Sequence, residues 1–373
     1  MRVLFAPDSF KGTLSSVAVA LALATGWSRA RPADDRLLSP LADGGEGTLD
    51  AIEAAGGWDR RHAIVVDPIH REIDATFLVG GSGDRTEAIV EMAQASGLSR
   101  LTADERDPLG ATSIGTGQLL LEAVSGGARR ITLGIGGSAT NDGGRGILEA
   151  LGGRVSSPAP DGPFRIDLAA LDARLADVEV EVACDVDNPL LGRRGAAATY
   201  GPQKGATPSD VARLDHRLGA WADALEAAAG RHERDTPGAG AAGGVGFALL
   251  CLQDRFRAFA LRPGVELVMA ATGFEAKLAR ADLVLTGEGR IDAQTAFGKT
   301  AFGVARRAQA AGVRCIAVGG GVEPDGAEAL AAIGARTVAV HDRPISLQEA
   351  KAAGAAPVEA CAERIASRIT EPA

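Results

Sequence analysis

The feature that most constrains the fold is an alternation, at both ends of the chain, of short apolar runs with helical stretches. Residues 2–6 form an apolar run that a proline stops, and the Ala- and Leu-rich stretch 16–29 follows. Near the other end, the apolar runs 283–286, 315–318 and 337–340 are each followed by a helical stretch. Since a strand, a loop and a helix make half of a βαβ unit, these runs predict one parallel sheet.

The middle of the chain has a different texture. Its strand-like segments lie between long Gly-rich turns, at residues 63–66, 73–79, 86–92, 131–135 and 178–183. A chain of 373 residues is longer than one hydrophobic core usually grows, so two domains are expected. We predict an α/β fold in which residues 1–66 and 281–373 form a Rossmann-like parallel-sheet domain. Residues 67–280 are expected to form an inserted mixed α/β domain, with the active site in the cleft between the two.

One helix has a clear start in the sequence. The run Thr207-Pro208-Ser209-Asp210 offers a capping threonine, a proline at the first helical position and an acid at the third. This pattern predicts a helix from there to about Ala229, after which residues 230–244 break it with charge, proline and glycine.

Composition argues against several classes of function. The net charge of −9 argues against a nucleic-acid or anionic-membrane partner, since either would be repelled. The cysteines lie far apart, at positions 184, 251, 315 and 361, and the histidines lie at positions 62, 70, 216, 232 and 341. Neither set has the spacing of a disulfide framework or of a zinc or iron site.

The N-terminus does not have the form of a secretion signal. Asp8 and Lys11 interrupt it before an apolar core develops, and the longest apolar run, 17–24, is well short of the ~20 residues of a membrane helix. We therefore expect a cytoplasmic protein.

Polar and glycine residues concentrate in a few loops that follow strands, where main-chain N–H groups and helix starts can bind an anion. These loops are residues 7–13, 41–48, 134–144, 184–188, 200–205 and 286–292. They predict a phosphate ligand.

Common nucleotide motifs do not account for these loops. A P-loop needs a glycine five residues before Gly298, and Ala293 stands there. A literal G-x-G-x-x-G occurs at residues 238–243, but it follows a polar, proline-containing loop rather than a strand, as a dinucleotide site requires. Ser138 lacks the second glycine of a nucleophile elbow, because Thr140 stands there, so a hydrolase triad is not indicated.

What remains is the chemistry of carboxylates and lysines, which is what phosphoryl transfer needs. We predict Lys11, Asp43 and Asp185 as catalytic residues, with Lys11 holding an anion and Asp43 or Asp185 deprotonating the acceptor hydroxyl. Asp187 or Asp292 is predicted to bind Mg²⁺. The predicted substrate- and phosphate-binding residues are Ser9, Glu46, Gly136, Gly137, Ser138, Asn141, Asn188, Lys204, Thr286, Gly287 and Gly289.

Each of the main candidates also has a purely structural interpretation. Lys11 can be a solvated loop lysine, and Asp43 and Glu46 can complement the N-terminus of the next helix. The acids of residues 185–188 can belong to an Asx turn that ends a strand, and Asp292 can cap a helix. Lys299 is expected to be structural or to contact phosphate.

Five blocks of the sequence resemble the bacterial glycerate kinase family, type 1. They are PDSFKGTLS at 7–15, PLADGGEGT at 40–48, GIGGSATNDGG at 134–144, CDVDNPL at 184–190, and GEGRID at 287–292 with Gln294, Thr295, Gly298 and Lys299. The blocks follow the order of the family and span nearly the whole chain.

The resemblance implies ATP-dependent phosphorylation of D-glycerate on a two-domain α/β fold without a P-loop. It favours 2-phosphoglycerate as the product, and 3-phosphoglycerate is the alternative. Two other functions stay open at this point: a nicotinamide-dependent oxidoreductase of a small hydroxy acid, which doubly wound α/β chains often are, and a non-enzymatic organic-acid sensor. The sequence does not predict the oligomeric state.

Overall fold

The structure is a computed structural model that describes residues 1–81, 83–157, 163–297 and 300–369. The chain divides into two compact units. The first unit consists of residues 1–43, 50–56 and 265–373, and the second of residues 44–49 and 57–264.

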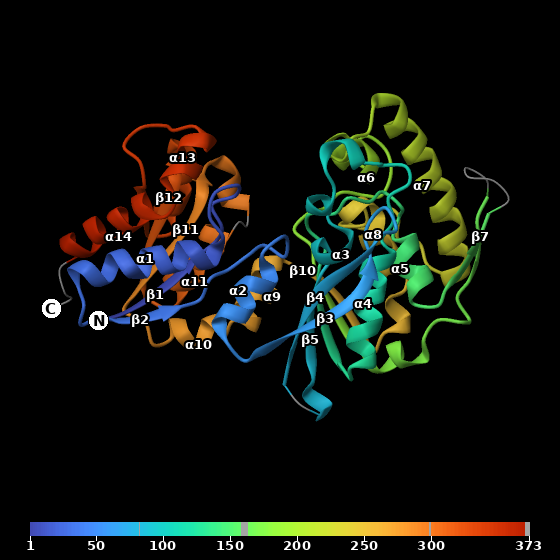
Figure 1. The fold of residues 1–373 in the computed structure, drawn as a ribbon, viewed down its shortest axis with the longest axis horizontal. Coiled ribbons are helices and arrows are strands. Elements are labelled where there is room, and N and C mark those ends of the chain that lie inside the picture. The colour runs from blue at the N-terminus through green and yellow to red at the C-terminus, as the bar shows by residue number, and fades with distance from the viewer. Residues whose placement is uncertain (82, 158–162, 298–299, 370–373) are drawn as a thin grey trace. The chain divides into compact units, whose positions relative to one another are not determined.

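The first unit is built on a five-stranded parallel sheet with the strand order β13-β12-β11-β1-β2 (Figure 1). The strands are β1 (Arg2–Pro7), β2 (Asp35–Leu38), β11 (Leu283–Ile291), β12 (Arg314–Val322) and β13 (Ala335–Ala339). The two ends of the chain meet in the centre of this sheet, where Val3 of β1 lies opposite Leu283 of β11.

Helices cover the two faces of this sheet. On one face, α1 (Ser16–Ala30) and α14 (Ala356–Arg368) pack beside each other, and Val3, Phe5 and Trp27 belong to their common core. The connections from β1 to β2 and from β11 to β12 run in opposite directions across the sheet, so right-handed crossovers place α11 (Thr300–Ala310) on the other face. The chain therefore reverses its strand order between β1 and β11, and in open α/β sheets ligands bind at such a switch point.

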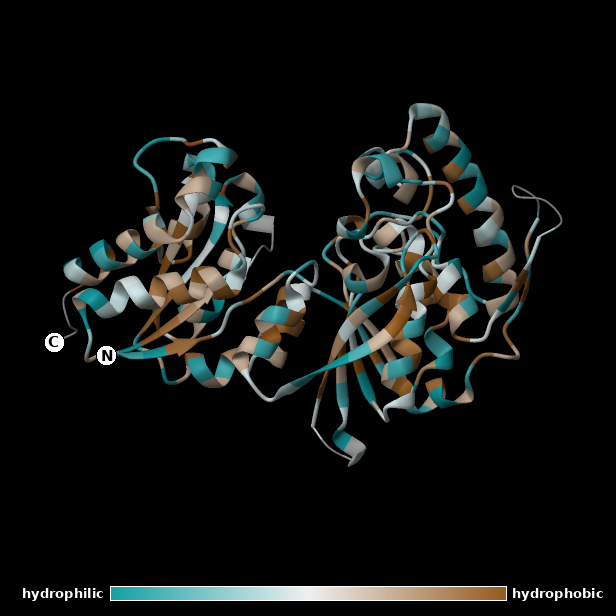
Figure 2. Ribbon diagram, viewed as in Figure 1, coloured by the Kyte–Doolittle hydropathy of each residue, from teal (hydrophilic) through white to brown (hydrophobic). Residues whose placement is uncertain are grey.

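The second unit is built on a six-stranded mixed sheet with the order β10-β9-β6-β5-β4-β3. Its parallel strands are β5 (Glu87–Glu91), β6 (Arg130–Gly134), β9 (Glu179–Ala183) and β10 (Ala258–Arg262), and the antiparallel ones are β3 (Trp58–Val66) and β4 (Glu72–Gly80). Figure 2 shows hydrophobic residues along the strands of both units and hydrophilic ones on the outward helix surfaces. This is the pattern of amphipathic helices packed on a buried sheet.

The remaining elements are mostly short. In the second unit they include α3 (Ala93–Ser96), α4 (Ile114–Ser125), α5 (Arg145–Ala150), α6 (Ala196–Tyr200), α7 (Pro208–Ala229), α8 (Ala241–Cys251) and the hairpin β7 (Arg154–Ser156) and β8 (Arg165–Asp167). In the first unit they include α10 (Phe274–Leu278), α12 (Pro324–Ala332) and α13 (Leu347–Ala353). The helices α2 (Thr48–Ala55) and α9 (Gly264–Ala271) complete the fold.

The predicted fold class is confirmed, since a parallel sheet formed by both chain ends accompanies a mixed α/β insertion. The helix predicted to begin at residue 208 is α7, and Thr207 and Asp210 form a capping box at its start. Among the described residues, no helix is long and apolar enough to cross a membrane.

The structure differs from the predicted boundaries at both ends of the insertion. The predicted limits were residues 66 and 281, but β3 belongs to the second unit because it pairs along its whole length with β4. Residues 265–280 belong to the first unit, where Lys277 donates a hydrogen bond to the Leu38 carbonyl.

A second difference concerns the predicted loop 286–292. Most of it is strand, because β11 continues to Ile291 and pairs with residues as far as Val322 of β12. Glycine at alternate positions is compatible with this strand, because Gly287 pairs with Val318 of β12 and Glu288 with Gly319, in a second glycine-rich strand.

Candidate functional site

A cavity of about 810 Å³ opens at the carboxyl edge of the first sheet. It is lined by the segments that follow β1 and β13 and by the C-terminal residues of β11 and β12, which places it at the switch point between β1 and β11. The lining comprises Asp8, Ser9, Phe10, Lys11, Thr13, Asp43, Glu288, Gly289, Arg290, Thr300, Gly320, Gly321, Val322, Glu323, Ala339, His341, Asp342, Arg343, Pro344, Ile345, Ser346, Leu347 and Ala350. A volume of this size is typical of a site for a small organic ligand.

The loop after β1 forms one wall of the cavity and is a tight, hydrogen-bonded turn. The Phe10 N–H donates to the Leu14 carbonyl at 2.9 Å, and the Thr13 hydroxyl donates to the Phe10 carbonyl at 2.7 Å. Gly12 has a φ of +80°, a left-handed conformation that favours glycine. The turn therefore fixes the backbone on both sides of Lys11.

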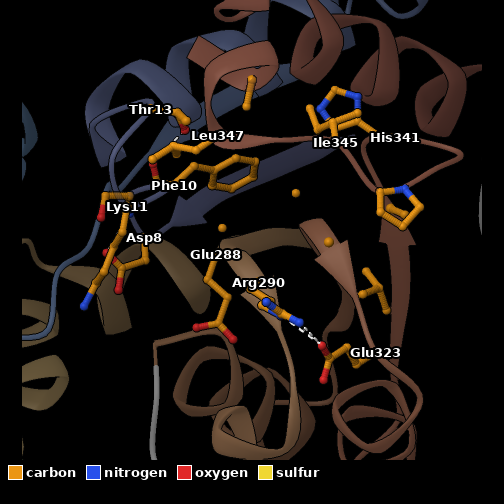
Figure 3. A pocket seen from close by; sticks show the side chains of 18 of the residues that line it. Asp8, Phe10, Lys11, Thr13, Glu288, Arg290, Glu323, His341, Ile345 and Leu347 are labelled. Carbon is orange, nitrogen blue, oxygen red and sulfur yellow. Dashed lines mark hydrogen bonds and ion pairs between the residues drawn. The ribbon is translucent and has the colours of Figure 1, made fainter.

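Lys11 extends from this turn toward a group of carboxylates (Figure 3). Its Nζ lies 2.8 Å from Asp43 Oδ2, in a pair whose side chains are 75% and 40% exposed. Burial works to lower the pKa of Lys11, but Asp43, Asp8 and Glu288 outweigh that effect and raise the pKa. Lys11 is thus a cation at neutral pH that is held among acids.

Asp8 is a buried carboxylate of this group, with 6% of its surface exposed, and Glu288 is buried to the same extent. Its Oδ2 accepts a hydrogen bond of 2.6 Å from the Thr300 hydroxyl, and its Oδ1 accepts one from the Ser9 N–H. Burial, followed by the charge of Asp43, raises the pKa of Asp8. A second cation near Asp8 would be favoured, since it would compensate these charges.

Glu288 points into the same part of the cavity from β11 and accepts a hydrogen bond of 2.5 Å from the Thr295 hydroxyl. Further along the strand ends, Arg290 pairs with Glu323. The apolar part of the lining includes Phe10 and Leu347, which Figure 3 shows above the charged groups. The cavity therefore combines a charged region with an apolar one.

The second unit contains another group of predicted residues, in the loop that follows β6. The Leu98 N–H donates to the Gly137 carbonyl at 2.8 Å, and the Ala139 N–H donates to the Ser96 carbonyl at 2.9 Å. These bonds fix the loop on both sides of Ser138, while Gly137 has a φ of +72° and is exposed.

Lys204 lies beneath this loop, at the end of the 3₁₀ turn Pro202–Lys204. Its Nζ donates to Ser138 Oγ at 2.9 Å and to the Thr140 carbonyl at 2.6 Å. Burial lowers the pKa of Lys204 to about 7, and the charge of Asp142 acts in the opposite direction. Gly136, Gly137, Ser138, Asn141 and Lys204, predicted separately from the sequence, therefore belong to one neighbourhood.

Other predicted residues of the second unit lie on exposed or structural positions. Asp185 and Asp187 are exposed; Asp185 accepts a hydrogen bond from the Gly264 N–H, and Asp187 pairs with Arg194. Asn188 bonds Tyr200 and other neighbours through both ends of its amide. Glu46 is exposed.

In the first unit, the cavity brings together Ser9, Lys11, Asp43 and Gly289 of the predicted residues. Thr286 is fully buried and donates to the Ala6 carbonyl within the sheet. Gly287 lies in β11, where its carbonyl accepts from the Asp8 N–H. Asp292 accepts from the Gln294 N–H at the start of the turn Ala293–Phe297 and is not among the residues that line the cavity. Lys299 lies outside the described residues.

Sequence reasoning did not select Asp8, Glu288 and Thr300, which line the charged part of the cavity. Asp8 and Glu288 lie inside the quoted polar blocks, so the composition of those blocks was a signal. The buried environment of Asp8 includes Thr300 at the start of α11, a helix almost 300 residues further along the chain.

Together, the fold and the cavity define a two-unit α/β protein with a cavity at the switch point of a parallel sheet. The sequence profile of the glycerate kinase family matches residues 3–370. The chain is 43% identical to a glycerate kinase of Halalkalibacterium halodurans, over 98% of this chain and 97% of that one. It is 42% identical to a glycerate 2-kinase of Escherichia coli, over 87% and 86% of the two chains.

A solved structure supports the same assignment. A crystal structure of a protein assigned as glycerate kinase 2 from Salmonella typhimurium LT2 superimposes with a TM-score of 0.84 and 40% identity, covering 98% of this chain and 97% of that one. The chain belongs to the glycerate kinase family. The predicted resemblance and the predicted enzyme class, a kinase, are thereby confirmed.

Proposed function

We propose that this protein transfers the γ-phosphoryl group of ATP to D-glycerate and releases ADP and 2-phosphoglycerate. The observation that carries the proposal is the cavity at the switch point between β1 and β11, which combines Lys11 with three carboxylates in a protein of this family. Phosphoryl transfer depends mainly on positioning and on charge stabilisation, and a lysine among acids can serve both.

The nucleotide is assigned to the cavity of the first unit. Its phosphates would lie near Lys11, whose ammonium can bind the transferring oxygens. The base would lie against the apolar lining that includes Phe10 and Leu347. Gly289 and Gly320 also line the cavity. Because glycine has no side chain, a ligand can approach the main chain closely at these positions.

The residues of the cavity fit a magnesium ion that arrives with the nucleotide. Among the described residues, no group of three or more His, Cys, Asp or Glu side chains is arranged to hold a metal ion by itself. Mg²⁺ does not need such a group, since it usually binds one or two carboxylates together with waters and substrate phosphates. Asp8 and Glu288 would hold it, and the ion would neutralise charge on the phosphates. The earlier candidates, Asp187 and Asp292, stay predictions.

The 2-hydroxyl is favoured as the acceptor because the relative from Escherichia coli is a glycerate 2-kinase. Transfer to the 3-hydroxyl is the alternative product. The base that receives the hydroxyl proton is proposed to be Asp43, whose side chain is 40% exposed, or Asp185, which is exposed directly after β9.

Phosphorus NMR of the purified protein with ATP, Mg²⁺ and D-glycerate tests this function directly. We expect ADP to appear together with one monoester signal, and its coupling to the neighbouring protons distinguishes 2- from 3-phosphoglycerate. ATP that stays unchanged in the presence of folded, ATP-binding protein would contradict the proposed acceptor. L-Glycerate and glycerol serve as controls for the configuration and for the carboxylate.

A further inference from the structure

The second unit contains a buried lysine without a counter-ion. Lys204 is 2% exposed, and among the described residues the partners of its Nζ are Ser138 Oγ and the Thr140 carbonyl. Both are neutral, and an ammonium group has three N–H donors. A buried cation with neutral partners is costly, because burial removes its hydration without supplying a compensating charge.

The nearest acid does not fill this role. Asp142 influences Lys204 through its charge, but its carboxylate accepts hydrogen bonds from the Ser113 N–H and hydroxyl and from the Gly144 and Gly146 N–H groups. These bonds tie α4 to the start of α5 and occupy both oxygens. Asp142 is therefore a structural cap, and the lysine needs its negative charge from elsewhere.

The residues next to the Thr140 carbonyl are also without partners. Asn141 is 4% exposed, and neither its Nδ2 nor its Oδ1 has a hydrogen-bond partner in the structure. The Thr140 hydroxyl is fully buried and equally unpartnered. Buried polar atoms are almost always hydrogen-bonded in folded proteins, so these three atoms, on Thr140 and the residue after it, are available to a bound polar ligand.

We propose that Lys204, Ser138, Thr140 and Asn141 bind the carboxylate and a hydroxyl group of the acceptor acid. This inference rests on the proposed function and assigns the acid to the second unit. The carboxylate would supply the missing charge on Lys204, and the Asn141 amide, which both donates and accepts, suits a hydroxyl group. The exposed Gly137 lies directly beside Ser138 in the chain.

A single carboxylate fits this cluster better than a nucleotide phosphate chain. The cluster offers one cation, whereas a triphosphate carries several negative charges and arrives with a metal ion that needs acidic ligands. Within the described residues, the acid whose charge acts on the pKa of Lys204 is Asp142, whose oxygens already accept hydrogen bonds. Inorganic phosphate serves as the competing ligand in the test.

Isothermal titration of the full-length protein with D-glycerate tests the assignment. In Lys204→Met, which keeps the length of the side chain and removes its charge, we expect the Kd for D-glycerate to rise by about 10²-fold. The Kd for Mg²⁺-ATP should stay within twofold of the wild type, since the nucleotide is assigned to the other unit. Lys351→Met, the same change at an exposed lysine of α13, is the matched control and should leave both constants unchanged.

Asn141→Asp provides a second test if Lys204→Met does not fold. This substitution places a carboxylate beside Lys204 and should both raise the melting temperature and weaken D-glycerate binding at least tenfold. A D-glycerate Kd within threefold of the wild type in a folded variant of either kind overturns the assignment. So does a wild type that binds inorganic phosphate at this site more tightly than D-glycerate, as measured by competition.

The steady-state constants separate this inference from the proposed function. If the wild type phosphorylates D-glycerate and Lys204→Met raises its KM for the acid but not for ATP, both proposals stand. If the wild type turns over and the variant keeps the wild-type KM, the assignment of this site fails alone. If the wild type neither binds nor phosphorylates D-glycerate, the proposed function fails and the carboxylate assignment fails with it.

Discussion

The two units differ in how the charge of a lysine is compensated. In the first unit, Lys11 is three-quarters exposed and surrounded by carboxylates, so its charge is compensated before any ligand arrives. In the second unit, Lys204 is buried among neutral groups, and its charge is not compensated. A crowded, solvated site can accept a ligand that brings its own cation, whereas a dry, uncompensated one favours a small anion.

The largest effect should come from Asp8, a buried acid of the first unit. In Asp8→Asn we expect kcat/KM to fall by at least about 10³-fold, because the carboxylate assigned to the metal ion is lost. Asp342→Asn, at an exposed acid of the same cavity, should change it less than threefold. Similar kinetics for the two variants would remove Asp8 from the site.

The same Asp8 variant should stabilise the fold. Because burial raises the pKa of Asp8 above its value in the unfolded chain, the folded state holds more protons in the window between the two values. The wild type therefore loses stability as pH rises through that window. The Asp8→Asn variant has no such loss, because an asparagine side chain does not titrate. At pH 7 the variant should melt at a higher temperature than the wild type, and a lower melting temperature would contradict this sign.

Removal of the solvated cation should have the next largest effect. We expect Lys11→Ala to lower kcat by about 10²- to 10³-fold, since one charge-stabilising contact in a closed site is typically worth that much. Stability should change little, because the Lys11–Asp43 pair is largely exposed. Steady-state kinetics and thermal melts check both parts, with Lys351→Ala as the control. Near-normal turnover of a folded variant would exclude Lys11 from the mechanism.

The buried cation of the second unit should instead appear in the pH dependence of stability. The pKa of Lys204 is lowered to about 7 in the folded state, so between about pH 7 and 10 the unfolded chain holds a proton that the folded one has released. Stability then rises with pH in this window, by a few kcal/mol at most. Urea unfolding at pH 7 and pH 9.5 should show this gain in the wild type relative to Lys204→Met. An identical pH response of the two proteins would mean that the pKa of Lys204 is not lowered in the folded state.

The smallest effect is expected at the rim of the first cavity. Ser346 caps α13, and its hydroxyl accepts from the Glu349 N–H while Glu349 accepts from the Ser346 N–H. Loss of such a cap costs about 1 kcal/mol. Because Leu347 and Ala350 of α13 line the cavity, Ser346→Ala should weaken ATP binding by about two- to fivefold and leave D-glycerate binding unchanged. A change in both constants would argue against separate sites in the two units.

Some elements were predictable because their causes are local. The helix α7 begins with a capping threonine followed by a proline, and these two residues define the start of a helix without any contact to distant segments. The strands β1, β6 and β9 are apolar runs, and each is followed in the sequence by a polar loop. By contrast, β11 extends through a glycine-rich segment because β12 pairs with it, and β10 was missed because its five residues are only partly buried.

The sequence by itself determined the α/β class, the family, and the loops in which the candidate residues lie, because strand and helix periodicity and the spacing of glycines and acids are local properties. Only the tertiary structure showed that Asp8 lines the cavity while Asp292 does not, and that Lys204 is buried while Lys351 is exposed. The reason is that burial, the pKa and the choice of partners depend on segments distant in the chain: α11 covers Asp8, and the loop after β6 covers Lys204.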